Sequence, residues 1–261
     1  VPKNLRNTTY SFRYNDIEAL NRLIAKKNIG IIKMEVSRSQ EPDIDFLKQV
    51  REICSKKSIV LIFDECTSGF RGAFGGLHKI CGVLPDMAIF GKALGNGYPI
   101  TAVLGKKDIM QSAQSTFISS TFWTERIGYV AALKTLDEME NIKSWEIISS
   151  KGNLIRKKWH KLADKYDLNI NTFGIAAIPG ISFISENNLA YKTLITQEML
   201  KKGFLASNLV YSCIKHSNKI IDKYFENLED VFALIHECED GKDVNSLLES
   251  PICHSGFERL N

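Results

Sequence analysis

Two short apolar runs, each followed by a polar functional group, most constrain what this chain can fold into. Residues 59–63 run directly into Asp64, and residues 87–90 are followed, after one glycine, by Lys92. Short runs rich in Val, Ile and Phe, bounded by Gly, Pro or Asp, are typical of buried strands. In a parallel α/β sheet the carboxyl ends of such strands open onto one crevice, where ligands bind. We therefore expect Asp64 and Lys92 to face one pocket.

An acid and an amine at one crevice suit a particular chemistry. A lysine held in a dry pocket can attack a carbonyl group and form a Schiff base. Pyridoxal phosphate needs such a lysine, and it needs an anionic carboxylate at its ring nitrogen to remain an electron sink. For an arbitrary Asp and Lys, an ordinary ion pair at a sheet edge is the alternative. The surrounding motifs favour the cofactor.

Four motifs surround the two residues in a fixed order. They read FDE at 63–65, TSGFR at 67–71, GVLPD at 82–86 and GKALGNGYP at 91–99. In order and spacing they resemble the core of the class III pyridoxal-phosphate-dependent aminotransferases, especially the glutamate-1-semialdehyde 2,1-aminomutase-like branch. The resemblance implies the α/β fold of a fold-type-I transferase, with Lys92 as the Schiff-base lysine and Asp64 as the partner of the ring nitrogen. It places Cys66 against the ring face, where a small soft side chain can pack.

The same resemblance assigns a role to Thr121, in the run SSTF before an expected helix at 124–139. In the family the matching threonine reaches across a dimer interface to the phosphate of the other subunit's cofactor. We therefore expect a homodimer with shared active sites, in which Thr121 binds the cofactor. Relatives usually continue with Gly-Asn-Pro, whereas this chain continues with Trp123. We interpret Trp123 as interface packing, because aromatic residues are enriched at subunit contacts.

The opening of the sequence resembles the middle of a family member. The first residue is Val, and residues 10–16 resemble the segment before a helix of the large domain. In relatives, a longer N-terminal portion carries a Ser-Gly-x-Glu-Ala loop that cups the cofactor phosphate, and nothing here matches that loop. We expect the chain to be the C-terminal part of a larger enzyme.

The order of elements predicts two domains. A strand at 29–36, a helix at 43–57 and the strand at 59–63 form a βαβ unit, which favours a mainly parallel sheet. We expect residues 1–142 to be the remainder of the cofactor-binding large domain and residues 143–261 to be a smaller α+β domain. The elements expected in the second domain are helices at 144–166, 190–202 and 218–239 and strands at 169–173, 177–185 and 204–213.

Several polar residues near the motifs have ordinary interpretations. The glycine-rich run 69–76 lacks the spacing of a phosphate-binding loop, so we interpret it as a surface loop that turns tightly. We interpret Arg71 as a solvated loop arginine, His78 as a hydrogen-bonding residue of the loop, and Glu35 as a strand-end carboxylate that bonds a loop.

Composition excludes other classes of protein. With 34 basic and 30 acidic residues the net charge is +4, too mild for a dedicated nucleic-acid-binding surface. Six cysteines occur without a CxxC pair, so we expect neither a metal site nor a redox dithiol. No segment has the length of a membrane span, and the opening residues do not resemble a signal peptide. We expect a cytoplasmic protein without membrane or nucleic-acid partners.

The sequence therefore predicts amino-group transfer between a small-molecule amine and a keto or aldehyde substrate, with pyridoxal 5'-phosphate as cofactor. Two alternatives remain open. One is an intramolecular aminomutase of the glutamate-1-semialdehyde type, which uses the same residues. The other is a non-catalytic or truncated homologue that only dimerises.

Overall fold

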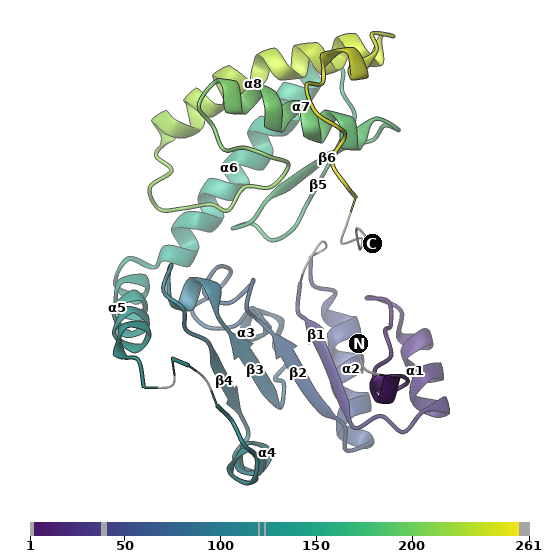
Figure 1. Ribbon diagram of the computed structural model, residues 1–261, viewed down its shortest axis with the longest axis vertical. Helices are drawn as coiled ribbons and strands as arrows, with labels where there is room; N and C mark the ends of the chain where they lie inside the picture. The colour runs from purple at the N-terminus through teal and green to yellow at the C-terminus, as the bar shows by residue number, and fades with distance from the viewer. Residues whose placement is uncertain (1–2, 38–40, 120, 123, 256–261) are drawn as a thin grey trace. The chain divides into compact units, whose positions relative to one another are not determined.

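The structure is a computed structural model that describes residues 3–37, 41–119, 121–122 and 124–255. The chain divides into two compact units, and the first gives way to the second between Glu138 and Met139. This boundary falls within helix α5 (Arg126–Ile142), a few residues before the end of the large domain expected from sequence. Figure 1 labels the elements of each unit.

The first unit is built on a four-stranded sheet. Its strands lie in the order β1 (Ile31–Glu35), β2 (Val60–Asp64), β3 (Met87–Phe90) and β4 (Ala102–Gly105) (Figure 1). The first three strands are parallel to one another, and β4 is antiparallel to β3. The predicted mainly parallel sheet is therefore confirmed, with one antiparallel edge strand.

Buried and more exposed side chains alternate along the strands, so one face of the sheet is covered by the hydrophobic core and the other is not. Side chains such as Ile32 on β1, Phe63 on β2 and Phe90 on β3 are buried, whereas the alternate positions of the same strands, such as Lys33, Asp64 and Ile89, are partly or largely exposed. Successive side chains of a strand point to opposite faces. Lys33 and Asp64 therefore share the face opposite the hydrophobic core.

Two helices with side-chain caps accompany the parallel strands. The Asp16 carboxylate accepts a hydrogen bond from the Ala19 amide at the start of α1 (Ile17–Lys26), and Asp43 caps α2 (Ile44–Lys56) in the same way. Helix α2 packs on β2 and on α1, and buries an apolar stripe at helical spacing. That stripe consists of Phe46, Leu47, Val50 and Cys54.

Short elements complete the first unit. They are the helices α3 (His78–Cys81) and α4 (Lys107–Met110) and the 3₁₀ turns at Lys3–Leu5, Lys92–Leu94 and Gln111–Ser115. Helix α5 follows and joins the two units in sequence.

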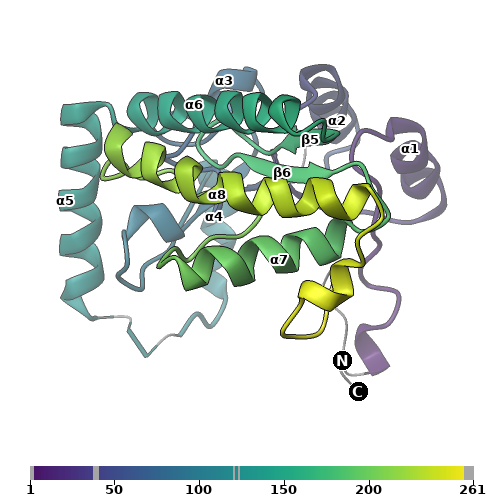
Figure 2. The same ribbon diagram turned by 90° about the horizontal axis from the view of Figure 1, so that it is seen from above.

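The second unit packs three helices on a two-stranded antiparallel sheet. Its elements are α6 (Ser144–Lys165), β5 (Ile170–Phe173), β6 (Gly180–Phe183), α7 (Asn188–Lys201) and α8 (Asn218–Glu239), followed by a 3₁₀ turn at Val244–Leu247. Helix α8 contacts both α6 and α7, and lies between them in Figure 2. The core includes the fully buried Trp159, Tyr191 and Phe232. None of the described helices is both long and apolar enough to cross a membrane.

The prediction of a strand at residues 204–213 is wrong. This segment runs beside β6 and makes backbone hydrogen bonds to it, such as Ile181 N to Asn208 O at 2.9 Å, but forms only an isolated bridge between Gly180 and Leu209. The Asn208 side-chain amide also donates to the Ile181 carbonyl. Asn side chains compete in this way with regular strand pairing, so the segment stays irregular.

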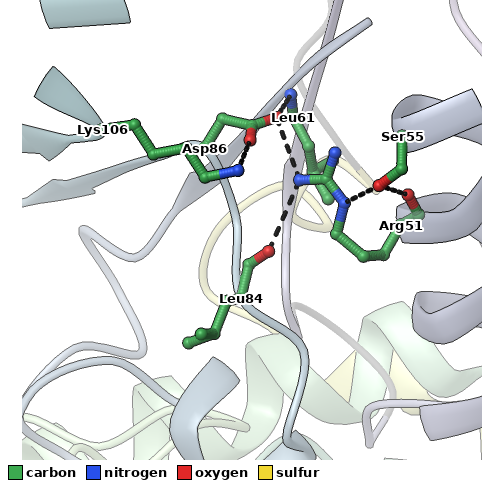
Figure 3. Close-up of polar contacts among 6 residues, drawn as sticks. All are labelled: Arg51, Ser55, Leu61, Leu84, Asp86 and Lys106. Carbon is green, nitrogen blue, oxygen red and sulfur yellow. Dashed lines mark hydrogen bonds and ion pairs between the residues drawn. The ribbon is translucent and has the colours of Figure 1, made fainter. Parts of the chain in front are cut away.

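Asp86 holds the amino-terminal ends of the central strands together. Its buried carboxylate accepts hydrogen bonds from the Leu61 amide at 2.8 Å and from the Arg51 guanidinium of α2 at 2.9 Å (Figure 3). The Lys106 ammonium lies 2.6 Å from its other oxygen. The Asp86 backbone also bonds Leu61 and Lys106. One aspartate thus joins α2, β2, β3 and β4, at the edge of the sheet opposite the carboxyl end of β2.

Replacing Asp86 with Ala is expected to lower the free energy of unfolding by about 3–5 kcal/mol, because it leaves the partly buried Arg51 charge without its carboxylate. The measurement is a urea unfolding midpoint followed by circular dichroism. The matched control is Asp45→Ala on α2, whose carboxylate is 88% exposed, for which we expect a loss below about 1 kcal/mol. Equal losses for the two variants would contradict the role assigned to Asp86.

Candidate active site

The candidate site lies where β2 and β3 end. Asp64 is the last residue of β2, and its backbone pairs with Ile89 of β3 on one side and Glu35 of β1 on the other. One carboxylate oxygen accepts a hydrogen bond from the Cys66 amide at 3.1 Å. The other lies 3.0 Å from the ammonium nitrogen of Lys33. Both oxygens of the carboxylate are therefore engaged.

These contacts keep Asp64 ionised. Partial burial opposes the charge, but the hydrogen bonds from Lys33 and Cys66, together with the positive charge of Lys33, outweigh it and lower the pKa of the Asp64 carboxyl. A carboxylate with a lowered pKa is anionic at neutral pH. Asp64 thus has the charge state that a partner of a protonated ring nitrogen needs.

Lys92 follows β3 after Gly91, so both candidate residues leave the sheet at the same edge. The backbone of Lys92 is left-handed, with a φ of 46°, and it begins a 3₁₀ turn. The Lys92 ammonium donates a hydrogen bond to the Thr67 hydroxyl at 2.9 Å. Thr67 stands three residues after Asp64, in the loop that follows β2. Sequence reasoning missed Thr67 as a site residue, although it belongs to the motif TSGFR.

Lys92 is exposed, which differs from the dry pocket expected from sequence. The described residues of this chain leave the Lys92 amine open to solvent. Its neighbours at the end of β3, Phe90 and Gly91, are buried. The site therefore combines a fixed backbone with an accessible amine.

Cys66 lies close to Asp64 and to the backbone that leads into Lys92. A Cβ atom added to Gly91 would lie 3.4 Å from the Cys66 sulfur, so the thiol packs close to the backbone just before Lys92. Burial raises the pKa of the Cys66 thiol, a hydrogen bond to Asp64 raises it further, and the positive charges of Lys92 and Lys33 oppose these effects. The thiol therefore stays protonated and acts as a small packing group.

Thr121 is not brought to this cluster. It lies exposed in a turn before α5, and within the described part of the chain no hydrogen bond joins it to Lys92 or Asp64. A role across a subunit interface involves a second chain, so the assignment of Thr121 stays a prediction. Trp123 lies outside the described residues.

A buried carboxylate next to Asp64 fixes the loop around the site. Glu65 has no exposed surface and accepts hydrogen bonds from the Ser68 hydroxyl, the Leu77 and His78 amides and the His78 ring nitrogen Nδ1. Gly76 is needed here, because a Cβ atom at this position would lie 2.2 Å from the His78 ring. The hydrogen-bonding interpretation of His78 is confirmed.

Arg71 of the same loop differs from its prediction. Its side chain is partly buried, and its guanidinium donates to the Thr67 carbonyl, so it is not a solvated loop arginine. The bond braces the loop that carries Thr67. The physical reason is the tight turn from Ser68 to Arg71, whose backbones are joined by a hydrogen bond of 3.1 Å.

The residues present fit part of a pyridoxal phosphate site. An ionised carboxylate and a primary amine follow the ends of adjacent parallel strands, and a small thiol packs against the backbone just before the lysine. This set matches the two ends of a flat heterocycle that carries a ring nitrogen and an aldehyde. Among the described residues, no group of three or more His, Cys, Asp or Glu could hold a metal ion.

Comparison with known proteins shows the family to which this chain belongs. Residues 18–229 match the family Aminotransferase class-III, and the chain belongs to that family. It is 35% identical over 247 residues to 3-aminobutyryl-CoA aminotransferase of Cloacimonas acidaminovorans, an alignment that covers 89% of this chain and 60% of the relative. It is 28% identical over 255 residues to glutamate-1-semialdehyde 2,1-aminomutase of Methanocaldococcus jannaschii, with the same two coverages.

The fold is shared with a solved structure. The FumI protein of Sphingopyxis sp. MTA144, solved in its pyridoxal phosphate internal aldimine form, superposes with a TM-score of 0.83 at 21% identity, over 92% of this chain and 60% of that chain. The predicted fold-type-I class is therefore confirmed. The chain spans about 60% of the length of these relatives.

Replacing Glu65 with Gln is expected to lower the free energy of unfolding by about 2 kcal/mol at neutral pH, because an amide presents its own donors to groups that donate to a carboxylate. Burial opposes the charge of Glu65, but its hydrogen bonds lower the pKa of this carboxyl below its ordinary value of 4.5. Its stabilising contribution is thus present above that pH and is lost as the pH falls through the lowered value.

Urea midpoints of the parent and the Glu65→Gln variant should therefore converge as the pH is lowered from about 6 to about 3. Glu18→Gln on α1, whose carboxylate is 84% exposed, is the matched control and should leave the midpoint unchanged at each pH. A difference between parent and Glu65→Gln that stays constant over this range would contradict the assignment.

Proposed function

We propose that this protein transfers amino groups with pyridoxal 5'-phosphate, as a class III aminotransferase acting on a small-molecule amine and a keto or aldehyde substrate. One observation carries the proposal. Within the residues matched by the family, the Lys92 amine and the ionised Asp64 carboxylate leave the sheet at the same edge, from adjacent parallel strands. A carboxylate and an amine in this arrangement suit the two ends of the cofactor ring.

The cofactor, when bound, supplies a conjugated ring that withdraws electrons from the substrate carbon next to the amine. Asp64 accepts a hydrogen bond from the ring nitrogen and keeps a proton on it, which is an electrostatic role of the kind that often dominates catalysis. Lys92 supplies the amine that attaches to the cofactor aldehyde. The Lys92 amine, when not attached to the cofactor, would be the group that moves a proton between the substrate carbon and the cofactor.

Neighbouring side chains position these two groups. The Thr67 hydroxyl holds the Lys92 ammonium at 2.9 Å and thereby directs the amine back over the end of β2. Cys66 would pack against the ring face, and the neighbouring Asp64 carboxylate helps to raise the pKa of its thiol. We propose that bound cofactor, substrate and a second subunit cover the Lys92 amine, which the described residues leave exposed.

A second candidate is an intramolecular aminomutase. The similarity to the aminomutase of Methanocaldococcus jannaschii, over 89% of this chain, supports it. The two reactions use the same residues and differ in whether the aminated cofactor leaves its substrate. Release of a keto product from an outside amine donor indicates a transferase, and isomerisation of one substrate without such release indicates a mutase.

We also propose a cytoplasmic homodimer with shared active sites, in which Thr121 reaches the cofactor phosphate of the partner. Large apolar side chains in the segment 117–133 support a subunit contact around Thr121, since exposed apolar patches mark interaction surfaces. These exposed residues are Phe117, Ile118, Phe122, Ile127, Tyr129, Val130 and Leu133. All six cysteines are free, which suits a reducing compartment.

Replacing Lys92 with Ala is expected to abolish covalent attachment of the cofactor and to lower amino transfer on the order of 10³-fold or more, because the nucleophile and the proton carrier are both lost. The measurement uses the full-length gene product with added pyridoxal phosphate. It records the visible absorption band and, after borohydride reduction, the cofactor mass on the peptide that contains residue 92.

The exposed lysine variant Lys107→Ala is the matched control and should keep both the band and the labelled peptide. Absence of both signals in the parent protein would favour the non-catalytic homologue. If the cofactor label persists in the Lys92→Ala variant, the reactive lysine is a different residue.

Replacing Leu133 with Glu is expected to weaken the dimer on the order of 30-fold or more, because it places a charge in the proposed apolar contact. Leu133 is 65% exposed on α5, so the change should leave the fold of each subunit intact. Sedimentation at several concentrations measures the mass. Leu200→Glu on α7, at 56% exposure, is the control and should sediment like the parent.

A further inference from the structure

Lys33 is a cation that the sequence did not connect with the site. It lies in the middle of β1, and parallel pairing places its Cα opposite Ile62 of β2, two residues before Asp64. Residues two apart on a strand share a face, so the long Lys33 side chain can run along the sheet to Asp64. Its ammonium lies 3.0 Å from one Asp64 oxygen, with the Lys33 side chain 55% exposed and that of Asp64 25% exposed.

The contact engages the carboxylate that the cofactor needs. The Cys66 amide already occupies one oxygen of Asp64, and Lys33 occupies the other. A protonated ring nitrogen that docks on Asp64 therefore meets a second cation at the same anion. Either the two cations share the carboxylate at close range, or Lys33 withdraws into solvent, which its exposed side chain permits.

We propose that Lys33 competes with the ring nitrogen of pyridoxal phosphate for Asp64, and that it thereby sets how tightly this protein holds its cofactor. The inference rests on the proposed function. In the absence of cofactor, Lys33 neutralises a partly buried carboxylate. In its presence, the Lys33 charge opposes the proton on the ring nitrogen and makes the ring a weaker electron sink.

The size of the effect follows from Coulomb's law. The repulsion between two like unit charges a few ångströms apart is weak in bulk water and strong in a dry protein interior. Near a protein surface, its energy lies between these two limits. Lys33 is half exposed and can move away, so the repulsion energy should lie nearer the bulk-water limit. We therefore expect a change in cofactor affinity of about tenfold, which corresponds to about 1.4 kcal/mol. Lys33 is thus a positioning residue that acts through Asp64.

The experiment measures pyridoxal phosphate affinity by spectral titration of the full-length gene product and its variants. Lys33→Met keeps the length of the side chain and removes the charge, so it should bind the cofactor about tenfold more tightly than the parent. Lys33→Arg keeps the charge and should bind like the parent. Lys107→Met removes an exposed lysine elsewhere in the first unit and should also bind like the parent.

A cofactor analogue separates competition from a structural effect. In 1-deazapyridoxal phosphate a carbon replaces the ring nitrogen, so Asp64 has no ring proton to hold. The gain in affinity of Lys33→Met over the parent should disappear with this analogue. A purely structural ion pair would instead lower the urea midpoint of Lys33→Met and would affect both cofactors alike.

The proposal is overturned if Lys33→Met binds pyridoxal phosphate no more tightly than the parent while the Lys92-dependent band is present, and the proposed function then still stands. It is also overturned if the tightening is equal with the deaza analogue. If the parent and every variant fail to bind pyridoxal phosphate, the proposed function fails, and this inference fails with it.

Discussion

The parallel pairing of β2 with β3 is the constraint on which the rest of the site depends. Because the two strands run in the same direction, the residues that follow them meet at one edge, and Asp64 pairs with Ile89 three positions before Lys92. No direct bond between Asp64 and Lys92 is needed for this juxtaposition. It is set by the backbone hydrogen bonds of the sheet and by the buried apolar residues on its core face.

Two buried carboxylates hold this pairing from opposite ends. Asp86 joins the amino-terminal ends of the central strands to α2 and β4, and Glu65 gathers the loop that follows β2. Each is satisfied by several donors, which offsets the cost of burying its charge. Asp86 and Glu65 are structural, whereas Asp64, directly before Glu65 in the chain, faces the opposite side of the sheet from the core. Asp64 and Glu65, the adjacent acidic residues of the motif FDE, thus have different roles.

Most strands, the main helices and the position of Asp64 and Lys92 at the ends of adjacent parallel strands could be predicted from sequence, because apolar runs and helical spacing are local signals. The segment 204–213 could not, because the side chain of Asn208 takes part in the pairing. The contact between Lys33 and Asp64 could not either, since it depends on the register of strands far apart in the chain. The partial burial of Arg71 could not be predicted, because it follows from the backbone turn at Ser68–Arg71, which composition does not define. The exposure of Lys92 could not be predicted either, because it depends on which other parts of the fold cover its side chain.

The left-handed backbone at Lys92 has a mechanical consequence. A residue with a φ of 46° turns the chain abruptly after β3, so the Cα atom is held by the peptide framework rather than by contacts along its side chain. The side chain of Lys92 therefore extends from a fixed Cα atom, and its ammonium group is held by a hydrogen bond to the Thr67 hydroxyl. Such a side chain can swing between partners without moving the strand that carries it. Movement of the Lys92 amine is thus confined to a single side chain.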